Sequence, residues 1–278
     1  MIRPVRAGDL EQAPTLLRRA FRDYRDALVY SHDVMAMFRR LWWTPLHGVA
    51  IEDDGRLVGL ALVGLREARF GARRLSVAHV GPVAVDPPLQ GRGLGDAMIA
   101  ALDPPADLMT LTTNDSENIR DFYLRRDFRV LCRWVPLVRN VNHPPGGSAV
   151  PAPPLQHPIV EAPVEAGQSF TAGGARVSAI QWPVTSRRSG FLERLKTCQI
   201  LSREGDGPAL GRALDQACQW ARAGRCELVW GEPHVTRGLP GFRSGGGAGV
   251  SRLVRPLTPA GFEVAETARG WMTSGPSP

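Results

Sequence analysis

A glycine-rich turn between a predicted strand and a predicted helix constrains the fold of this 278-residue chain most strongly. The segment from Pro82 to Met98 reads PVAVDPPLQGRGLGDAM, so that an apolar run is followed by Gly91, Gly93 and Gly95. Beyond Gly93 the apolar residues recur at the spacing of an amphipathic helix. Glycine lets the backbone bend sharply and lets a ligand approach closely. The segment therefore predicts a strand, a loop and a helix whose amides form an anion site.

Two common phosphate-binding motifs fit this loop poorly. A Walker-type loop needs Gly-Lys-Ser or Gly-Lys-Thr, whereas Gly95 is followed by Asp96 and Ala97. The Rossmann fingerprint needs a further glycine at position 96 or 98, and these positions hold Asp96 and Met98. A flexible turn without a ligand stays as the plain alternative, because the chain holds 30 glycines.

The first 140 residues alternate between strand and helix patterns, which predicts a mixed α/β unit. One helix is expected to begin with a capping box at Asp9 and Gln12. Its apolar face is Leu10, Ala13, Leu17, Ala20 and Phe21. The full predicted order is a strand at 2–5, this helix, a second helix from 33, a hairpin turning at 53–55, a strand at 75–85, the helix after Gly93, a strand at 108–113, a helix from 114 and a last strand at 128–138.

A proline-rich stretch divides the chain. Residues 141–169 hold few large apolar residues and no periodicity, which predicts a stiff linker between a unit at 1–140 and a smaller unit at 170–278. The second unit repeats the element order of the first, which indicates a degenerate internal copy. An unrelated small α/β domain is the alternative. In place of the glycine loop the second unit has Glu204, Asp206 and Pro208, so we expect no cofactor there.

Composition and charge narrow the classes of partner. The net charge of +7 favours anionic ligands, but no basic stripe with interleaved aromatic residues supports nucleic-acid binding. The four cysteines have no zinc-site spacing, so buried free thiols and no metal are expected. No apolar signal core and no membrane-length apolar run are found, so we expect a cytoplasmic protein without a membrane partner.

The glycine loop resembles that of the GNAT superfamily of acyl-CoA-dependent N-acyltransferases. The run from Gln90 to Gly95, QGRGLG, matches the signature Gln/Arg-x-x-Gly-x-Gly/Ala. Residues 114–128, NDSENIRDFYLRRDF, resemble the family's following helix, with Tyr123 and Phe128 at matching positions. The resemblance covers most of residues 1–140. It implies a GNAT-like first domain and, through the internal repeat, a degenerate GNAT-like second domain.

Three positions depart from the family pattern. Asp127 replaces the glycine that usually precedes the phenylalanine, and Ile119 replaces a small residue. Asn118 lies two places later than the family's asparagine. None of these departures touches the loop. The resemblance implies acetyl-CoA (CoA) as the cofactor, bound by Val83, Val85, Gln90, Gly91, Arg92, Gly93, Leu94, Gly95 and Asn118.

The resemblance also implies a mechanism, in which an acetyl group passes directly to a primary amine of a small molecule or peptide. Gly81 and Pro82 predict a bulge where the family's strand splays from its neighbour. Tyr123 is the expected general acid for the leaving thiolate, and packing on Phe122 or Ile119 is its structural alternative. His79, at the position of a glutamate in some members, is the expected base, and a purely structural histidine is the alternative. Lesser candidates for the base are Glu52, Asp53, His47 and ordered water.

The acceptor side is expected in residues 21–43, which in this family cover the acceptor. Its aromatic residues could line a pocket or belong to the core: Tyr24, Tyr30, Phe38, Trp42 and Trp43. A non-catalytic acyl-CoA-binding regulatory module is the alternative function. The sequence leaves the acceptor, the acyl-chain length and the choice between monomer and homodimer open.

Overall fold

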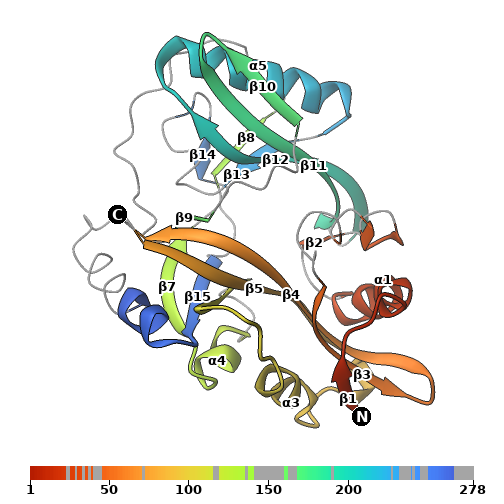
Figure 1. Ribbon diagram of the computed structural model, residues 1–278. Helices are drawn as coiled ribbons and strands as arrows, with labels where there is room; N and C mark the ends of the chain where they lie inside the picture. The colour runs from red at the N-terminus through yellow and green to blue at the C-terminus, as the bar shows by residue number, and fades with distance from the viewer. Residues whose placement is uncertain are drawn as a thin grey trace.

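The chain folds around two mixed sheets, with helices packed on both of them (Figure 1). This arrangement confirms the predicted α/β class. The computed structural model describes residues 1–22, 26–28, 30–32, 35–36, 39, 46–70, 73–114, 119–134, 137–140, 160–161, 168–188, 191–226, 228–231, 239, 242–244 and 250–265.

The first sheet carries helices on both faces. Leu60 and Leu62 pack with α1, whereas the alternating Ala61 and Val63 pack in the cluster that holds α3 and α4. Because successive strand residues point to opposite faces, α1 covers one face, and α3 and α4 cover the other. The helices are α1 (Asp9–Ala20), α3 (Leu94–Ala100) and α4 (Ile119–Leu124). The strands, in spatial order, are β1 (Ile2–Pro4), β3 (His47–Asp53), β4 (Arg56–Phe70), β5 (Arg73–Val85), β6 (Leu108–Asn114), β15 (Val250–Pro256) and β7 (Arg129–Trp134), and β9 (Val160–Glu161) pairs with β4.

The predicted hairpin is confirmed between β3 and β4. Asp54 and Gly55 have φ angles of 46° and 73°, the left-handed pair of a tight two-residue hairpin turn. Such a turn matches the natural twist of the two strands. The Asp-Gly pair is therefore sufficient to predict the hairpin from the local sequence.

The predicted capping box at the start of α1 is wrong. Gly8 is the N-cap, and Asp9 is the first helical residue. The Asp9 carboxylate accepts hydrogen bonds from the Arg3 guanidinium at 2.7 and 2.8 Å, while Gln12 Oε1 accepts one from the Leu57 amide at 2.9 Å. Burial alone would raise the pKa of Asp9, but the bonds from Arg3 and from the Arg6 amide lower it below its ordinary value. The side chains of Asp9 and Gln12 thus bind residues outside the helix instead of capping its N-terminal end.

The second sheet is covered by a long amphipathic helix. Leu210, Ala213, Leu214 and Ala217 of this helix are buried against it. The helix is α5 (Gly207–Ala223), and the strands in spatial order are β10 (Gln168–Ala172), β11 (Ala175–Arg188), β12 (Phe191–Glu204), β13 (Leu228–Gly231), β8 (Leu137–Asn140) and β14 (Arg243–Ser244), while β2 (Asp26–Leu28) pairs with β11.

The two sheets exchange strands. In the first sheet an antiparallel pair is followed by parallel β6, then β15 from the C-terminal half, then β7. In the second sheet an antiparallel pair is followed by parallel β13, then β8 from the N-terminal half, then β14. The order of these strands repeats, as expected for an internal duplication. The second sheet holds β2 and β8 from residues 1–140, and the first sheet holds β15 from residues 170–278.

One strand prediction needs correction because of this exchange. Residues 128–138 were expected to form a single last strand, but β7 and β8 belong to different sheets. The boundaries 1–140, 141–169 and 170–278 stay a prediction about chain order. They do not separate the two sheets, since β8 and β15 each cross from one half to the other.

Among the described residues, three buried cysteines form no disulfide: Cys198, Cys218 and Cys226. Burial raises the pKa of Cys198, and the neighbouring thiols Cys226 and Cys218 raise it further. No helix in the described part of the chain has the length and apolar character needed to cross a membrane.

Candidate active site

The two central parallel strands of the first sheet separate partway along their length. β5 and β6 pair only at Val77 with Leu108, at Ala78 with Met109, and at His79 with Thr110. Beyond these pairs both strands continue, β5 to Val85 and β6 to Asn114, without pairing each other. The backbone groups of residues 80–85 that face β6 are therefore free of a ladder partner on that side.

A bulge in β5 accompanies this separation. Ala61 pairs with Val83 and Val63 pairs with Val80, so two residues of β5, Gly81 and Pro82, oppose one residue of β4. Gly81 has a φ of 155°, a conformation that favours glycine, and Pro82 has no amide hydrogen to donate. The predicted bulge is confirmed at these two residues. The bulge allows the end of β5 to separate from β6 while it stays paired with β4.

The glycine loop follows directly where β5 ends. A single 3-10 turn, η1 (Pro87–Leu89), leads to Gly91 and Gly93, which have left-handed φ angles of 76° and 78°. A Cβ at either glycine would meet nothing within 4 Å, so the backbone conformation and not crowding calls for glycine. None of the described residues accepts a hydrogen bond from the amides of residues 91–95. These amides are available to a ligand.

A different constraint acts on Gly95, in the first turn of α3. A Cβ there would lie 3.2 Å from the Phe122 ring of α4, so glycine allows the two helices to approach. Arg126 reinforces this contact, because its guanidinium pairs with Asp96 and lies 3.5 Å from the centre of the Phe122 ring. Helices α3 and α4 are thus held together beside the opening between the strands.

Tyr123 lies on α4, beside the separated strands. Its side chain is only 8% exposed and meets the rings of Phe122 and Phe128 edge to face, at 5.0 and 5.6 Å between ring centres. It packs in the same core cluster as Val80 and Leu111, the first residues of β5 and β6 past their last pair. We call the point at which β5 and β6 separate, just beyond His79 and Thr110, the fork. The aromatic contacts hold the Tyr123 ring beside the fork, on the face of the sheet that α4 covers.

Asp127, which replaces the family's glycine, adopts a backbone conformation that glycine would otherwise supply. It has a φ of 62°, the left-handed conformation that a glycine would supply after this helix. Aspartate adopts this conformation more readily than most residues. The Phe128 amide then donates to the Tyr123 carbonyl at 3.3 Å, which closes the end of α4.

His79 lies at the last paired position of β5, at the fork itself. Its Nδ1 lies 3.2 Å from the hydroxyl of Thr110, which is buried on β6. Its neighbours Ala78 and Val80 point into the cluster that holds Tyr123, so alternation places His79 on the opposite face. The two predicted catalytic side chains therefore come from opposite sides of the opening. Sequence reasoning missed Thr110, because nothing in LMTLTT distinguishes this threonine from its neighbours.

The other predicted site residues have different outcomes. Glu52 is paired with Arg3 at 2.7 Å, away from the fork. Tyr30 stacks on Phe21 with 5.8 Å between ring centres, next to α1. Five of these predicted residues lie outside the described residues: Tyr24, Phe38, Trp42, Trp43 and Asn118.

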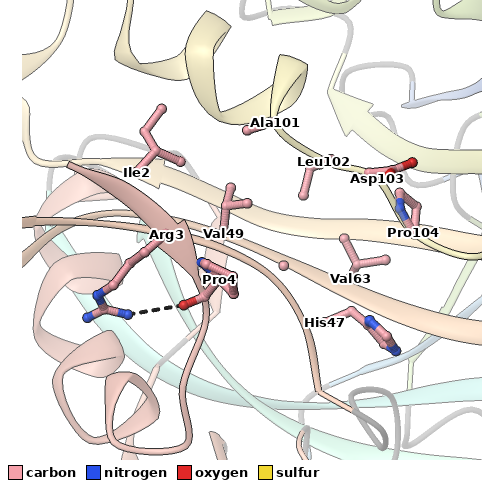
Figure 2. Close-up of a pocket in the computed structure, with 11 residues that line it drawn as sticks. Ile2, Arg3, Pro4, His47, Val49, Val63, Ala101, Leu102, Asp103 and Pro104 are labelled. Carbon is pink, nitrogen blue, oxygen red and sulfur yellow. Dashed lines mark hydrogen bonds between the residues drawn. The ribbon is translucent and has the colours of Figure 1, made fainter.

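A separate pocket of about 370 Å³ lies between β1, β3 and the end of α3 (Figure 2). His47 and Asp103 supply polar groups, and the remaining wall is largely apolar, from Ile2, Val49, Val63 and Leu102. The Arg3 guanidinium is turned away from this wall and donates to the Pro4 carbonyl at 3.2 Å. Neither the glycine loop nor Tyr123 nor His79 lines this pocket, so it is distinct from the fork.

The fold and the fork together define a class. A mixed sheet whose central parallel strands part beside a glycine-rich loop is the architecture of the GNAT acyltransferases. Residues 16–128 match the model of the Acetyltransferase (GNAT) family. Residues 16–128 are therefore a GNAT-family domain, which supports an acyltransferase that uses an acyl-CoA as the donor.

Solved structures with the same fold span nearly the whole chain. Saccharomyces cerevisiae N-myristoyltransferase with bound myristoyl-CoA matches with a TM-score of 0.56 and 11% identity, over 93% of this chain and 86% of that one. The same enzyme with myristoyl-CoA and inhibitors matches with a TM-score of 0.57 and 11% identity, over 93% and 82%. A GCN5-related N-acetyltransferase from Kribbella flavida matches with a TM-score of 0.49 and 16% identity, over 92% and 71%. No curated protein matches the sequence.

Proposed function

We propose that this chain is an N-acetyltransferase that moves the acetyl group of acetyl-CoA directly to a primary amine of a small molecule or peptide. One observation carries the proposal: β5 and β6 separate beyond His79 and Thr110, next to a loop whose amides have no acceptor among the described residues. An opening between strands can admit an extended thioester arm, and the loop can bind the diphosphate at its end.

The residues of the loop fit coenzyme A. Successive amides at residues 91–95 and the N-terminal end of α3 supply hydrogen-bond donors and positive charge to a diphosphate. Arg92 is exposed and adds a guanidinium. The Gln90 side chain donates to the Val85 carbonyl at 3.0 Å, which supports the start of the loop. The edge of β5 that lacks a strand partner, with Val83 and Val85, would hold the pantetheine arm.

Acyl transfer needs an uncharged amine, a polarised carbonyl and a proton for the departing thiolate. Bound acetyl-CoA supplies an activated acetyl group as a thioester. In the proposed reaction the C–N bond forms as the C–S bond breaks. His79, directly or through water, takes a proton from the amine, and the Tyr123 phenol donates one to the sulfur. Free amides of the β5 edge polarise the carbonyl.

The test replaces Tyr123 by phenylalanine, which keeps the ring and its edge-to-face contacts but removes the phenol. We expect kcat to fall by about 100-fold while the Kd for acetyl-CoA changes little, because the phenol acts only as the thiolate forms. Turnover is followed as free thiol released with a panel of primary amines, and Kd by calorimetry.

Two outcomes would overturn parts of this proposal. Unchanged kcat in Tyr123→Phe would remove the general-acid role. Acetyl-CoA binding by the wild-type chain without thiol release for any amine, peptide or small molecule, would favour the non-catalytic binding module instead.

A further inference from the structure

A buried carboxylate lies at the junction between β5 and the glycine loop. Asp86 is 4% exposed and immediately follows the last residue of β5. Its Oδ2 accepts hydrogen bonds from Arg19 at 2.8 Å and from Arg56 at 2.9 Å. Arg19 belongs to α1 and Arg56 to β4, so one oxygen atom joins two elements to the start of the loop.

The backbone of Asp86 adds two further connections. Its amide donates to the Val58 carbonyl of β4 at 2.8 Å, and its carbonyl accepts from the Leu89 amide at 2.8 Å, which closes the turn η1. The residue is thus bonded to the sheet behind it and to the loop ahead of it.

The loop has few other anchors: the Gln90 side chain donates to the Val85 carbonyl at 3.0 Å, and Leu89 and Leu94 pack against the core cluster. Residues 87, 88 and 90–93 are exposed, and the glycines bring no side chain to bury. Exposed segments with few buried contacts open at low free-energy cost. The conformation of the exposed residues 90–93 therefore depends in large part on the anchor at Asp86.

We propose that Asp86 is a positioning residue for the coenzyme, which locks the glycine loop to α1 and β4 in its binding conformation. This inference rests on the proposed function of the loop. A carboxylate between two guanidinium groups offsets their mutual repulsion, so its loss separates the three elements that meet there. A loop that is only partly in its binding conformation lowers the apparent affinity by the fraction that is competent.

Asp86→Asn keeps the size of the side chain and removes its charge. We expect the Kd and KM for acetyl-CoA to rise about tenfold, because the hydrogen bonds from Arg19 and Arg56 lose the charge of their acceptor. Because bound coenzyme orders the loop again, kcat at saturating acetyl-CoA stays within about twofold of wild type. Calorimetry gives Kd, and initial rates separate KM from kcat.

The chain offers a matched control in Asp9. It is equally buried, at 4% exposure, and also accepts two guanidinium hydrogen bonds, but it lies at the opposite end of α1 from Arg19. Asp9→Asn should lower the thermal midpoint to a similar degree and leave the Kd for acetyl-CoA within about twofold of wild type. Equal weakening by both variants would mean general destabilisation and would overturn the inference.

Arg19→Met tests the same link without disturbing the carboxylate, and it decides the matter if Asp86→Asn does not fold. We expect a Kd about threefold weaker, and in the double variant no further loss beyond Asp86→Asn. Wild-type Kd in Arg19→Met would contradict the link. Absence of acetyl-CoA binding by the wild-type chain is a different result, which overturns the proposed function and takes this inference with it.

Discussion

At the scale of single residues, the structure places the two predicted catalytic residues, His79 and Tyr123, at one fork in the sheet. His79 and Tyr123 are candidates because both lie at fixed distances along the sequence from a recognisable loop. Their surroundings were not predictable in the same way. His79 contacts Thr110, and Arg19 and Arg56 bind Asp86. The residues of each pair are at least 30 positions apart, so no local sequence pattern predicts these contacts.

The role of His79 can be tested through the pH dependence of the reaction. A protonated imidazole cannot accept a further proton, so a histidine base loses its function as the pH falls through its pKa. We expect wild-type kcat/KM to rise with pH as this base loses its proton. His79→Gln should lower kcat/KM about 100-fold at pH 8 and abolish this rise.

His47→Gln is the control for that measurement. His47 lines the separate pocket beside β1 and β3 and does not lie at the fork (Figure 2). Its substitution should leave the pH profile as in wild type. If His47→Gln altered the pH profile and His79→Gln did not, the assignment of the base to His79 would be wrong.

At the scale of elements, local chemistry predicted most of the first sheet. The Asp-Gly turn, the Gly81–Pro82 bulge and the helix after Gly93 each depend on backbone preferences that a few residues set. Local sequence patterns could not predict which sheet a short strand joins. Residues 26–28, in the expected acceptor segment, form β2 and pair with β11 of the second sheet, where Ala27 lies opposite Thr185.

This pairing predicts that the second sheet holds the acceptor segment in place. Ala27→Pro removes an amide hydrogen and is disfavoured inside a strand pair, so the segment should detach from β11. We expect the KM for the amine to rise about tenfold, while the Kd for acetyl-CoA stays unchanged. Initial-rate kinetics in both substrates and calorimetry provide the measurements. Ala27→Ser retains the amide and should behave as wild type; an equal effect of both changes would argue against the pairing.

At the scale of the whole molecule, the sequence predicted two related halves but not their exchange of strands. Repetition of element order is visible along a sequence, whereas the partner of each strand is decided by long-range packing. Leu253 and Val254 of β15 are fully buried, one in the cluster of Tyr123 and the other in the cluster with Leu108. The first sheet is therefore completed by β15, from the last part of the described chain (Figure 1).

A fragment that ends at residue 249 should consequently fail to fold. It loses β15 from between β6 and β7, and burial of each large apolar side chain contributes about 1.5–3 kcal/mol against a typical total stability of about 5–15 kcal/mol. Circular dichroism and thermal unfolding should show no cooperative transition. A fragment that ends at residue 265 retains β15 and should unfold cooperatively. Cooperative unfolding of the shorter fragment would show that the first sheet is stable without the exchanged strand.

The central claim is that the amides of residues 91–95 bind the diphosphate of coenzyme A. Titration calorimetry of the wild-type chain with coenzyme A and with pantetheine, which lacks the diphosphate, tests it most directly. We predict a defined heat of binding for coenzyme A and an affinity at least about 100-fold lower for pantetheine, since charge-assisted hydrogen bonds to backbone amides are lost. Equal affinity for the two compounds, or no heat with coenzyme A at low salt, would contradict the claim.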